Sequence, residues 1–126
     1  MREVIETADA PAAVGAYSQA IATEELVFTA GQIPLTPDGE LLDGASIEDQ
    51  TERALENVAA VLEAADSGLD EAIKVTVMLD DIDDFEAMNA VYGSYFEGAP
   101  PARSAFEVGS LPKGVGVEIE AVAHRR

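Results

Sequence analysis

The sequence predicts an α+β fold, in which a mixed sheet of five to six strands carries two helices on one of its faces. Two segments place apolar residues at helical spacing, and several shorter segments alternate apolar with polar residues or are rich in β-branched ones. In chain order these segments read as two or three strands, a helix, a strand, a second helix and two final strands. The 126 residues fit a single domain at positions 1–126 with one core.

The first half of the chain predicts two strands and one helix. Residues 2–5 and 26–30 have strand-like composition. Ser46 and Asp49 resemble a capping box at the start of the helix. The apolar positions of this helix recur every three or four residues: Ile47, Ala54, Leu55, Val58, Leu62 and Ala65. We expect Gly68 to end the helix, because glycine takes a left-handed conformation without steric cost.

The second half predicts a strand, a helix and two closing strands. Residues 72–79 alternate strictly between two faces, as in a half-buried strand. The acidic residues 81–84 suit a helix N-terminus. The apolar stripe of this second helix is more typical of a core than of a cofactor site: Phe85, Met88, Tyr92, Tyr95 and Phe96. Residues 103–108 and 115–124 read as strands, and the loop 109–114 between them predicts an antiparallel hairpin.

The last strand predicts which face of the sheet the helices cover. One set of its alternating residues is apolar and is expected to face the helices: Val117, Ile119, Ala121 and Ala123. The other set is expected to face away: Glu118, Glu120, Val122 and His124. The uncovered face is either solvated or covered by a second copy of the chain, and periodicity alone does not choose between them.

The charge balance is the unusual feature of the composition. Seven lysines and arginines against 25 acidic residues give 7 − 25 = −18, which disfavours nucleic acid and anionic lipid as partners. One interpretation is a very soluble acidic protein. The other, favoured by the scarcity of lysine, is a halophilic protein adapted to concentrated salt. The chain has no cysteine, no long apolar run and no signal-like start, so we expect a cytoplasmic protein without a membrane span.

Arg103 and Glu118 are the strongest candidates for a chemical site. In a hairpin centred near residues 111–112, Arg103 would lie opposite Glu120. Ala105 would then lie opposite Glu118, so that an arginine and two glutamates converge on one face. A guanidinium can hold a carboxylate through two parallel hydrogen bonds, and a glutamate can deprotonate water. The alternative interpretation of Arg103 is a salt bridge between neighbouring strands.

Other kinds of catalytic centre lack their residues. With no cysteine and with His124 as the single histidine, zinc sites and Cys-His dyads are excluded, and no serine has a base other than His124. No glycine-rich dinucleotide loop is present. The acidic residues 80–84 are more typical of a helix cap than of a metal site. We therefore expect no metal site.

Five stretches in order resemble the RidA/YjgF family of imine/enamine deaminases: Ala10–Ala20, Thr29–Pro34, Asp84–Tyr92, Pro101–Ala105 and Leu111–Ala121. The resemblance implies a chorismate-mutase-like fold and a homotrimer whose sheets face the three-fold axis, with active sites in clefts between subunits. It also implies hydrolysis of 2-iminobutanoate, 2-iminopropanoate and related 2-imino acids to 2-keto acids and ammonia, without a cofactor.

The resemblance also implies roles for individual residues. Arg103 matches the arginine that binds the substrate carboxylate, and Glu118 matches the glutamate that positions or activates water. The remaining substrate-binding positions are Tyr17, Gly31, Asn89 and the backbone of Ala105. The family often has serine where this chain has Ala30 and cysteine where it has Ala105, so rate or substrate range is expected to differ.

Three other functions are compatible with the sequence. The same cleft could bind 2-keto acids without turnover and regulate a partner, in a non-catalytic trimer. Some members of the family have been assigned ribonuclease or translation-inhibiting activity, against which the absence of a basic patch argues. A chaperone-like role is the third alternative.

Overall fold

The computed structural model describes residues 1–126, which form six strands and two α-helices. The strands are β1 (Glu3–Ile5), β2 (Ala20–Ala22), β3 (Leu26–Thr29), β4 (Ala72–Leu79), β5 (Ala102–Glu107) and β6 (Val117–His124). The helices are α1 (Ile47–Ala64) and α2 (Phe85–Ser94). Short 3₁₀ turns lie at Leu69–Glu71, Ile82–Asp84 and Pro112–Gly114. All the predicted strands and helices are present, and β2 is the additional strand before the first helix.

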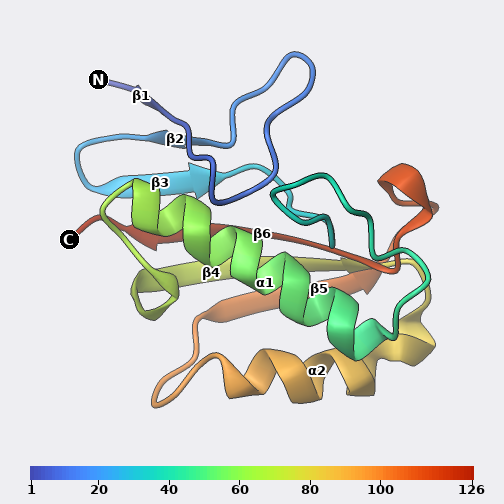
Figure 1. Ribbon diagram of the computed structural model, residues 1–126. Helices are drawn as coiled ribbons and strands as arrows, with labels where there is room; N and C mark the ends of the chain where they lie inside the picture. Colours follow the sequence, from blue (N-terminus) through green and yellow to red (C-terminus); the bar gives the residue numbers. More distant parts are fainter.

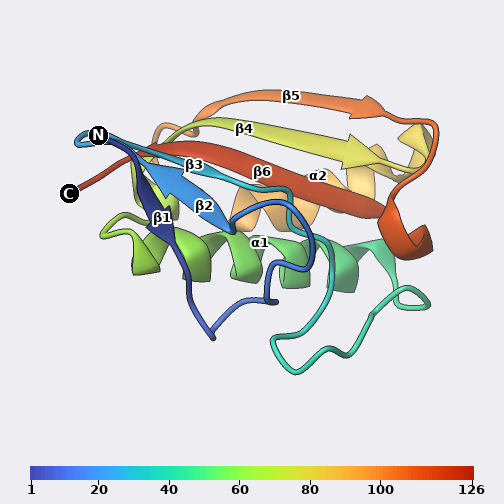
Figure 2. The same ribbon diagram turned by 90° about the horizontal axis from the view of Figure 1, so that it is seen from above.

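The six strands form one mixed sheet with the order β1-β2-β3-β6-β4-β5 (Figure 1). All neighbours are antiparallel except β4 and β5, which are parallel and are joined through α2. Seen from above, both helices lie on the same side of the sheet (Figure 2). The predicted α+β fold with two helices on one face is therefore confirmed.

The predicted hairpin between the last two strands is wrong. β4 lies between β5 and β6, so Arg103 pairs with Val75 and not with Glu120. Likewise Ala105 pairs with Val77 and not with Glu118. The physical reason is the α2 crossover, since a parallel pair needs a long connection and this one sets β5 beside β4 at the sheet edge. The chain then crosses back to place β6 in the centre.

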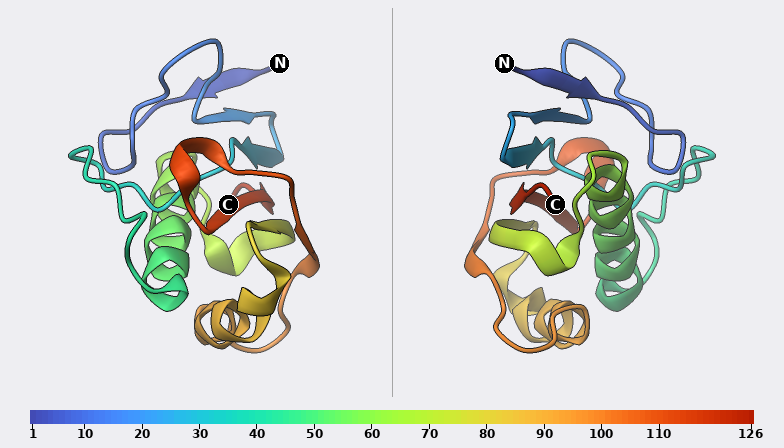
Figure 3. Two further views of the ribbon diagram at one scale, coloured as in Figure 1. Left: turned by 90° about the vertical axis from the view of Figure 1, so that its right-hand side faces the viewer. Right: turned by 90° about the vertical axis from the view of Figure 1, so that its left-hand side faces the viewer.

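The core lies between the helices and one face of the sheet. The buried residues of β6 are those predicted to face the helices: Val117, Ile119, Ala121 and Ala123. Helix α1 packs against β6 and against α2, and the end-on views show the two helices on the same side of the sheet (Figure 3). The fully buried apolar residues of α1 are Ala54, Leu55, Val58, Val61 and Leu62. The predicted facing of the last strand is thus confirmed.

The two ends of α1 differ in how well they were predicted. The Ser46 hydroxyl accepts a hydrogen bond from the Asp49 backbone N–H at 3.1 Å, which confirms the predicted cap. The prediction for Gly68 is wrong, because Asp66 takes the left-handed conformation with φ of 59° and Gly68 is extended with φ of 177°. A Cβ at position 68 would instead overlap the ends of the exposed Arg126 and Asp70 side chains, which would have to shift.

The face of the sheet opposite the helices is uncovered in the single chain. Cross-strand pairing places Phe28 of β3 beside Val122, and Phe106 of β5 in one row with Met78 and Glu118. Phe28 and Phe106 are 46% and 45% exposed. This face therefore combines large apolar side chains with the carboxylates of β6. None of the helices has both the length and the apolar character needed to cross a bilayer.

Candidate functional site

An irregularity beside β6 creates the first half of the candidate site. Phe28 pairs with Val122, and Gln32 forms a further bridge with Ile119 through hydrogen bonds of 2.7 and 3.0 Å. Three residues separate Phe28 from Gln32, whereas two separate Ile119 from Val122, so one extra residue must be accommodated as in a β-bulge. The Thr29 hydroxyl compensates by accepting the Ala121 backbone N–H at 3.0 Å. We call residues 29–32 the bulge segment.

The bulge segment brings Gly31 against the carboxylate of Glu118. A Cβ built on Gly31 would overlap the Glu118 Oε2 and Cδ atoms, so no other residue fits beside this carboxylate in its observed position. Both residues line a cavity of 620 Å³ together with Tyr17, Lys113 and an apolar wall. That wall includes Pro11, Ala12, Val14, Ile33, Leu35 and Pro112. Glu118, Gly31 and Tyr17 therefore meet as expected in one pocket, which we call the glutamate half-site.

The environment of Glu118 favours its protonated form. Partial burial raises the pKa of the Glu118 carboxyl above its ordinary value of 4.5, and the neighbouring carboxylate of Glu120 raises this pKa further. Because the folded-state pKa exceeds the unfolded value, Glu118 destabilises the fold as the pH rises through the interval between the two. A carboxyl group with a raised pKa in a cavity is a candidate general base.

Arg103 lies in a second pocket, on the face of β5 that is turned toward α2. Its Nη1 donates a 2.6 Å hydrogen bond to the Asn89 side-chain oxygen. The guanidinium carbon lies 4.8 Å from the ring centre of Tyr92 and 5.3 Å from that of Phe85. Two aromatic rings and a neutral amide thus hold the guanidinium through cation–π attraction and one hydrogen bond. We call Arg103, Asn89, Phe85 and Tyr92 the arginine half-site.

The arginine half-site leaves the positive charge of Arg103 available for a ligand. Arg103 takes part in neither of the two salt bridges, which join Arg125 to Glu3 and Arg126 to Asp70. A cavity of 420 Å³ opens beside Arg103 and is lined also by Asn89, Tyr92 and the loop at residues 98–101. The alternative interpretation of Arg103 as a partner of a neighbouring strand carboxylate is therefore wrong.

The two half-sites lie on opposite faces of the sheet within one chain. Arg103 aligns with Val75 and Ala121, which face the helices, whereas Glu118 aligns with Met78 on the open face. Two strand spacings, roughly 10 Å, also separate β5 from β6. The expectation that Arg103 and Glu118 converge on one face of a single chain is wrong, because it depended on the hairpin that β4 interrupts.

The remaining predicted residues divide between the two half-sites. Asn89 contacts Arg103 directly, while Tyr17 and Gly31 lie with Glu118. Ala105 follows Arg103 two residues along β5, on the same face, and packs partly buried against the core. The sequence placed Phe85 and Tyr92 in a core stripe and missed their contact with Arg103. Their spacing of seven residues, with Asn89 between them, puts all three on one helical face and was the available signal.

Metal-binding groups do not gather anywhere in the chain. No cluster of three or more histidine or acidic side chains is arranged to hold an ion. The polar groups of the two half-sites are a guanidinium, an amide, a phenol and a carboxylate, which together can bind a small anion and activate water.

The fold and the half-sites define a small α+β protein with separate cavities beside Arg103 and Glu118. Known proteins are closely similar to it in sequence and in fold. The model of a family described as Endoribonuclease L-PSP matches residues 7–125. A RutC family protein of Pyrococcus horikoshii is 52% identical over 126 residues, covering 99% of either chain. The 2-iminobutanoate/2-iminopropanoate deaminase of Rattus norvegicus is 42% identical over 123 residues, covering 98% of this chain and 90% of its own.

Solved structures agree with these sequence relationships. The crystal structure of E. coli TdcF with bound serine superposes with a TM-score of 0.93 at 42% identity, covering 98% of this chain and 99% of that one. The chain therefore belongs to the RidA/YjgF family, as the five sequence stretches indicated.

Substitution of Gly31 by alanine tests the contact with Glu118. The new methyl group must displace the Glu118 carboxylate into solvent, so the pKa of Glu118 should fall toward its ordinary value. The free energy of unfolding should change little, because the overlapped atoms end a flexible side chain that can move aside. Glu118 can be titrated by carbon NMR with labelled glutamate. Gly44→Ala is the matched control, because a Cβ there meets nothing within 4 Å. An unchanged Glu118 pKa in Gly31→Ala would contradict the contact.

Proposed function

We propose that this chain is a cytoplasmic enzyme that hydrolyses 2-imino acids, such as 2-iminobutanoate and 2-iminopropanoate, to 2-keto acids and ammonia without a cofactor. The observation that carries the proposal is the half-buried carboxyl of Glu118, which has a raised pKa and lines a 620 Å³ cavity. A relative of 42% identity is named as a deaminase of these two substrates. Serine bound to TdcF adds that a relative of similar fold accommodates a small amino acid.

The complete site, in this proposal, forms between two copies of the chain. The half-sites lie on opposite faces of one sheet, so Arg103 of one subunit would meet Glu118 of the next. The exposed Phe28 and Phe106 on the open face supply apolar surface for such an assembly. The homotrimer implied by the family resemblance has this geometry, because a closed ring repeats one head-to-tail contact.

The proposed reaction assigns one task to each charged group. Arg103 binds the substrate carboxylate with its free N–H groups, while Asn89 and the two rings keep the guanidinium in place. Glu118 takes a proton from a water molecule as the water oxygen bonds to the C=N carbon. Glu118 passes this proton to the nitrogen, which gives a carbinolamine. The proton of the carbinolamine hydroxyl then moves to the nitrogen through Glu118, the C–N bond breaks, a carbonyl forms on the same carbon and ammonia leaves.

The rigidity of both half-sites supports positioning as the main catalytic effect. Arg103 is held by three side chains of α2, and Glu118 is held against the Gly31 backbone of the bulge segment. Groups fixed in this way lose little entropy when the substrate binds. Ala30 and Ala105 contribute no reactive side chain, so the arginine and the glutamate would carry the reaction.

A ribonuclease function is the competing proposal, since the matching family model carries that description. The charge of −18 and the single histidine do not favour RNA binding or cleavage. Ammonia release from freshly generated iminobutanoate, against an enzyme-free control, separates the two functions. Cleavage of RNA without any ammonia release would overturn the deaminase proposal, and binding of a 2-keto acid without turnover would favour the regulatory alternative.

Mixed assemblies test whether the site is shared between subunits. Arg103→Ala and Glu118→Gln chains should each lose roughly 100-fold or more in activity when expressed alone. Co-expressed, they should recover about a quarter of wild-type activity, since half of the arginine positions and half of the facing glutamate positions are intact. Separately purified variants mixed without subunit exchange are the control. Absence of recovery in proven mixed assemblies would place the site within one chain.

The pH profile tests the role of Glu118. If Glu118 acts as a base, kcat/KM should fall as the pH decreases through its raised pKa, above the ordinary value of 4.5. Glu118→Gln should be slow at every pH and should lack this acid limb. Glu120→Gln removes the neighbouring charge without removing the base, so it should shift the limb to lower pH. If Glu118→Gln kept the acid limb of the wild-type pH profile, that limb would belong to the titration of another group.

Ionic strength tests the effect of the net charge. The −18 charge repels an anionic substrate at low salt, and screening shortens the range of this repulsion from about 10 Å at 0.1 M to about 3 Å at 1 M. We expect KM to fall severalfold over this range while kcat changes little. Circular dichroism at each salt concentration checks that the protein stays folded. A flat or rising KM in the folded protein would refute the steering argument and weaken the case for salt adaptation.

A further inference from the structure

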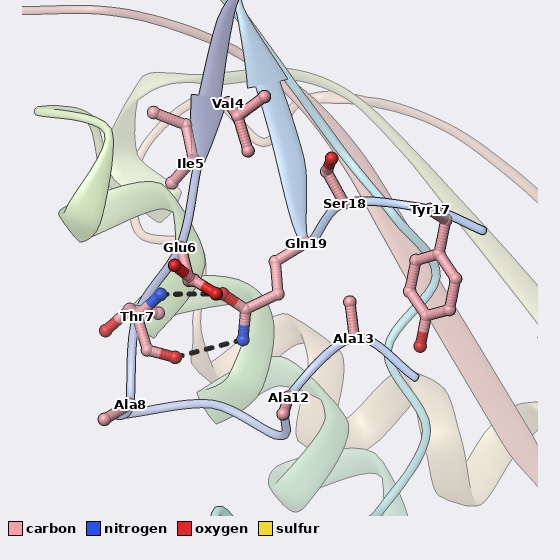
Figure 4. Close-up of a pocket in the computed structure, with 10 residues that line it drawn as sticks. All are labelled: Val4, Ile5, Glu6, Thr7, Ala8, Ala12, Ala13, Tyr17, Ser18 and Gln19. Atoms are coloured by element: carbon pink, nitrogen blue, oxygen red, sulfur yellow. Dashed lines mark hydrogen bonds between the residues drawn. The ribbon is translucent and has the colours of Figure 1, made fainter. Parts of the chain in front are cut away.

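Gln19 is a buried amide that the proposed reaction does not use. Its side chain is 3% exposed and forms hydrogen bonds to three backbone positions in the segment before it. The oxygen accepts the Thr7 N–H at 2.7 Å, and the nitrogen donates to the carbonyls of Thr7 at 3.1 Å and Pro11 at 2.8 Å. Figure 4 shows the amide pointing back toward Thr7 across the loop.

The amide continues the sheet where the backbone stops. The β1–β2 ladder ends at the pair of Ile5 and Ala20, after which the chain leaves the sheet. The N–H and the C=O of Thr7 are nevertheless both hydrogen-bonded, because the Gln19 side chain supplies one acceptor and one donor. It takes the place of the backbone of a neighbouring strand. A buried N–H or C=O without a partner costs about 1–3 kcal/mol, so an apolar residue at 19 would release this segment.

Gln19 also connects this segment to the glutamate half-site. Its backbone carbonyl accepts the N–H of Ala30 at 2.8 Å, directly before Gly31 in the bulge segment. Pro11 and Ala12 form one wall of the Glu118 cavity, and Tyr17 forms another. Ala12, Tyr17 and Gln19 itself line both this cavity and a second cavity of 550 Å³, shown in Figure 4. A shift of the segment that Gln19 holds would therefore reshape the Glu118 cavity.

We propose that Gln19 is a positioning residue that holds Pro11, Ala12 and Tyr17 in place as walls of the Glu118 cavity, and so sets the affinity of that cavity for a 2-imino or 2-keto acid. The inference deepens the proposed function and rests on it for the identity of the ligand. Gln19 also lines the Glu118 cavity, and we assign its effect to the hydrogen bonds that it forms with residues 7–11. Its effect should therefore appear in KM and in ligand affinity more than in kcat.

The experiment compares Gln19→Leu with Ser67→Ala in the assembled protein. Ser67 is 2% exposed and donates to the His124 carbonyl, remote from both cavities, so its variant controls for loss of a buried hydrogen bond. We expect Gln19→Leu to raise KM and the Kd for 2-ketobutanoate roughly tenfold, with kcat changed less. Ser67→Ala should lower stability alone. Gln19→Glu, which keeps the size and the acceptor but loses the donors, is the second variant should Gln19→Leu fail to fold.

A double-mutant cycle and hydrogen exchange make the inference refutable. If Gln19 acts through Tyr17 and its loop, Gln19→Leu should cost little further affinity in a Tyr17→Ala background. Exchange of the Thr7 amide, which donates to the Gln19 side-chain oxygen, should accelerate in Gln19→Leu and not in Ser67→Ala. Additive losses in the cycle, or unchanged exchange, would overturn the positioning role. A wild-type protein that binds the keto acid without releasing ammonia would defeat the proposed reaction, and the affinity cycle would still decide the role of Gln19.

Discussion

The extra residue between Phe28 and Gln32 is the constraint on which the glutamate half-site depends. It interrupts the ladder between β3 and β6 and carries Gly31 over the Glu118 side chain. The Ala121 N–H, which the interruption would leave unpaired, is satisfied by the Thr29 hydroxyl. On the β2 side, the Gln19 carbonyl accepts the Ala30 N–H and holds the segment in place. The irregular backbone is thus held by specific bonds, as expected of a β-bulge that re-aims groups beside a site.

In both half-sites the charged group lacks a partner of opposite charge, and this sets the electrostatics of the site. Arg103 has no carboxylate partner in a chain with 25 acidic residues, because aromatic rings and an amide occupy its surroundings. Glu118 forms no salt bridge, and the neighbouring carboxylate of Glu120 adds to the effect of burial in raising its pKa. An unpaired guanidinium attracts an anion, and a carboxyl with a raised pKa accepts a proton near neutral pH more readily. Both groups are therefore kept reactive by the absence of partners.

The elements of the fold were predictable because they depend on local patterns. Alternation in residues 117–124 and the cap at Ser46 are set by neighbours within a few positions, and both are confirmed. Strand order was not predictable in this way, since the insertion of β4 between β5 and β6 depends on packing across the whole chain. The same holds for the site. The structure places Arg103 and Glu118, the residues that the resemblance selected, in two separate pockets. The predicted register that set them on one face was wrong.

The separation of the half-sites offers a reason for the apolar residues on the open face of the sheet. Arg103 on the helix side of the edge strand and Glu118 on the open side cannot hold one small ligand within a single chain. Under the proposed function, an open face with only polar residues would not drive assembly, and each half-site would then lack its counterpart from the next subunit. Phe28 and Phe106 on the same face as Glu118 would tie assembly to catalysis, because the apolar burial that joins subunits would also bring Arg103 to the next glutamate. Assembly of the oligomer would then be required for activity, and the burial of Phe28 and Phe106 would also stabilise the assembly.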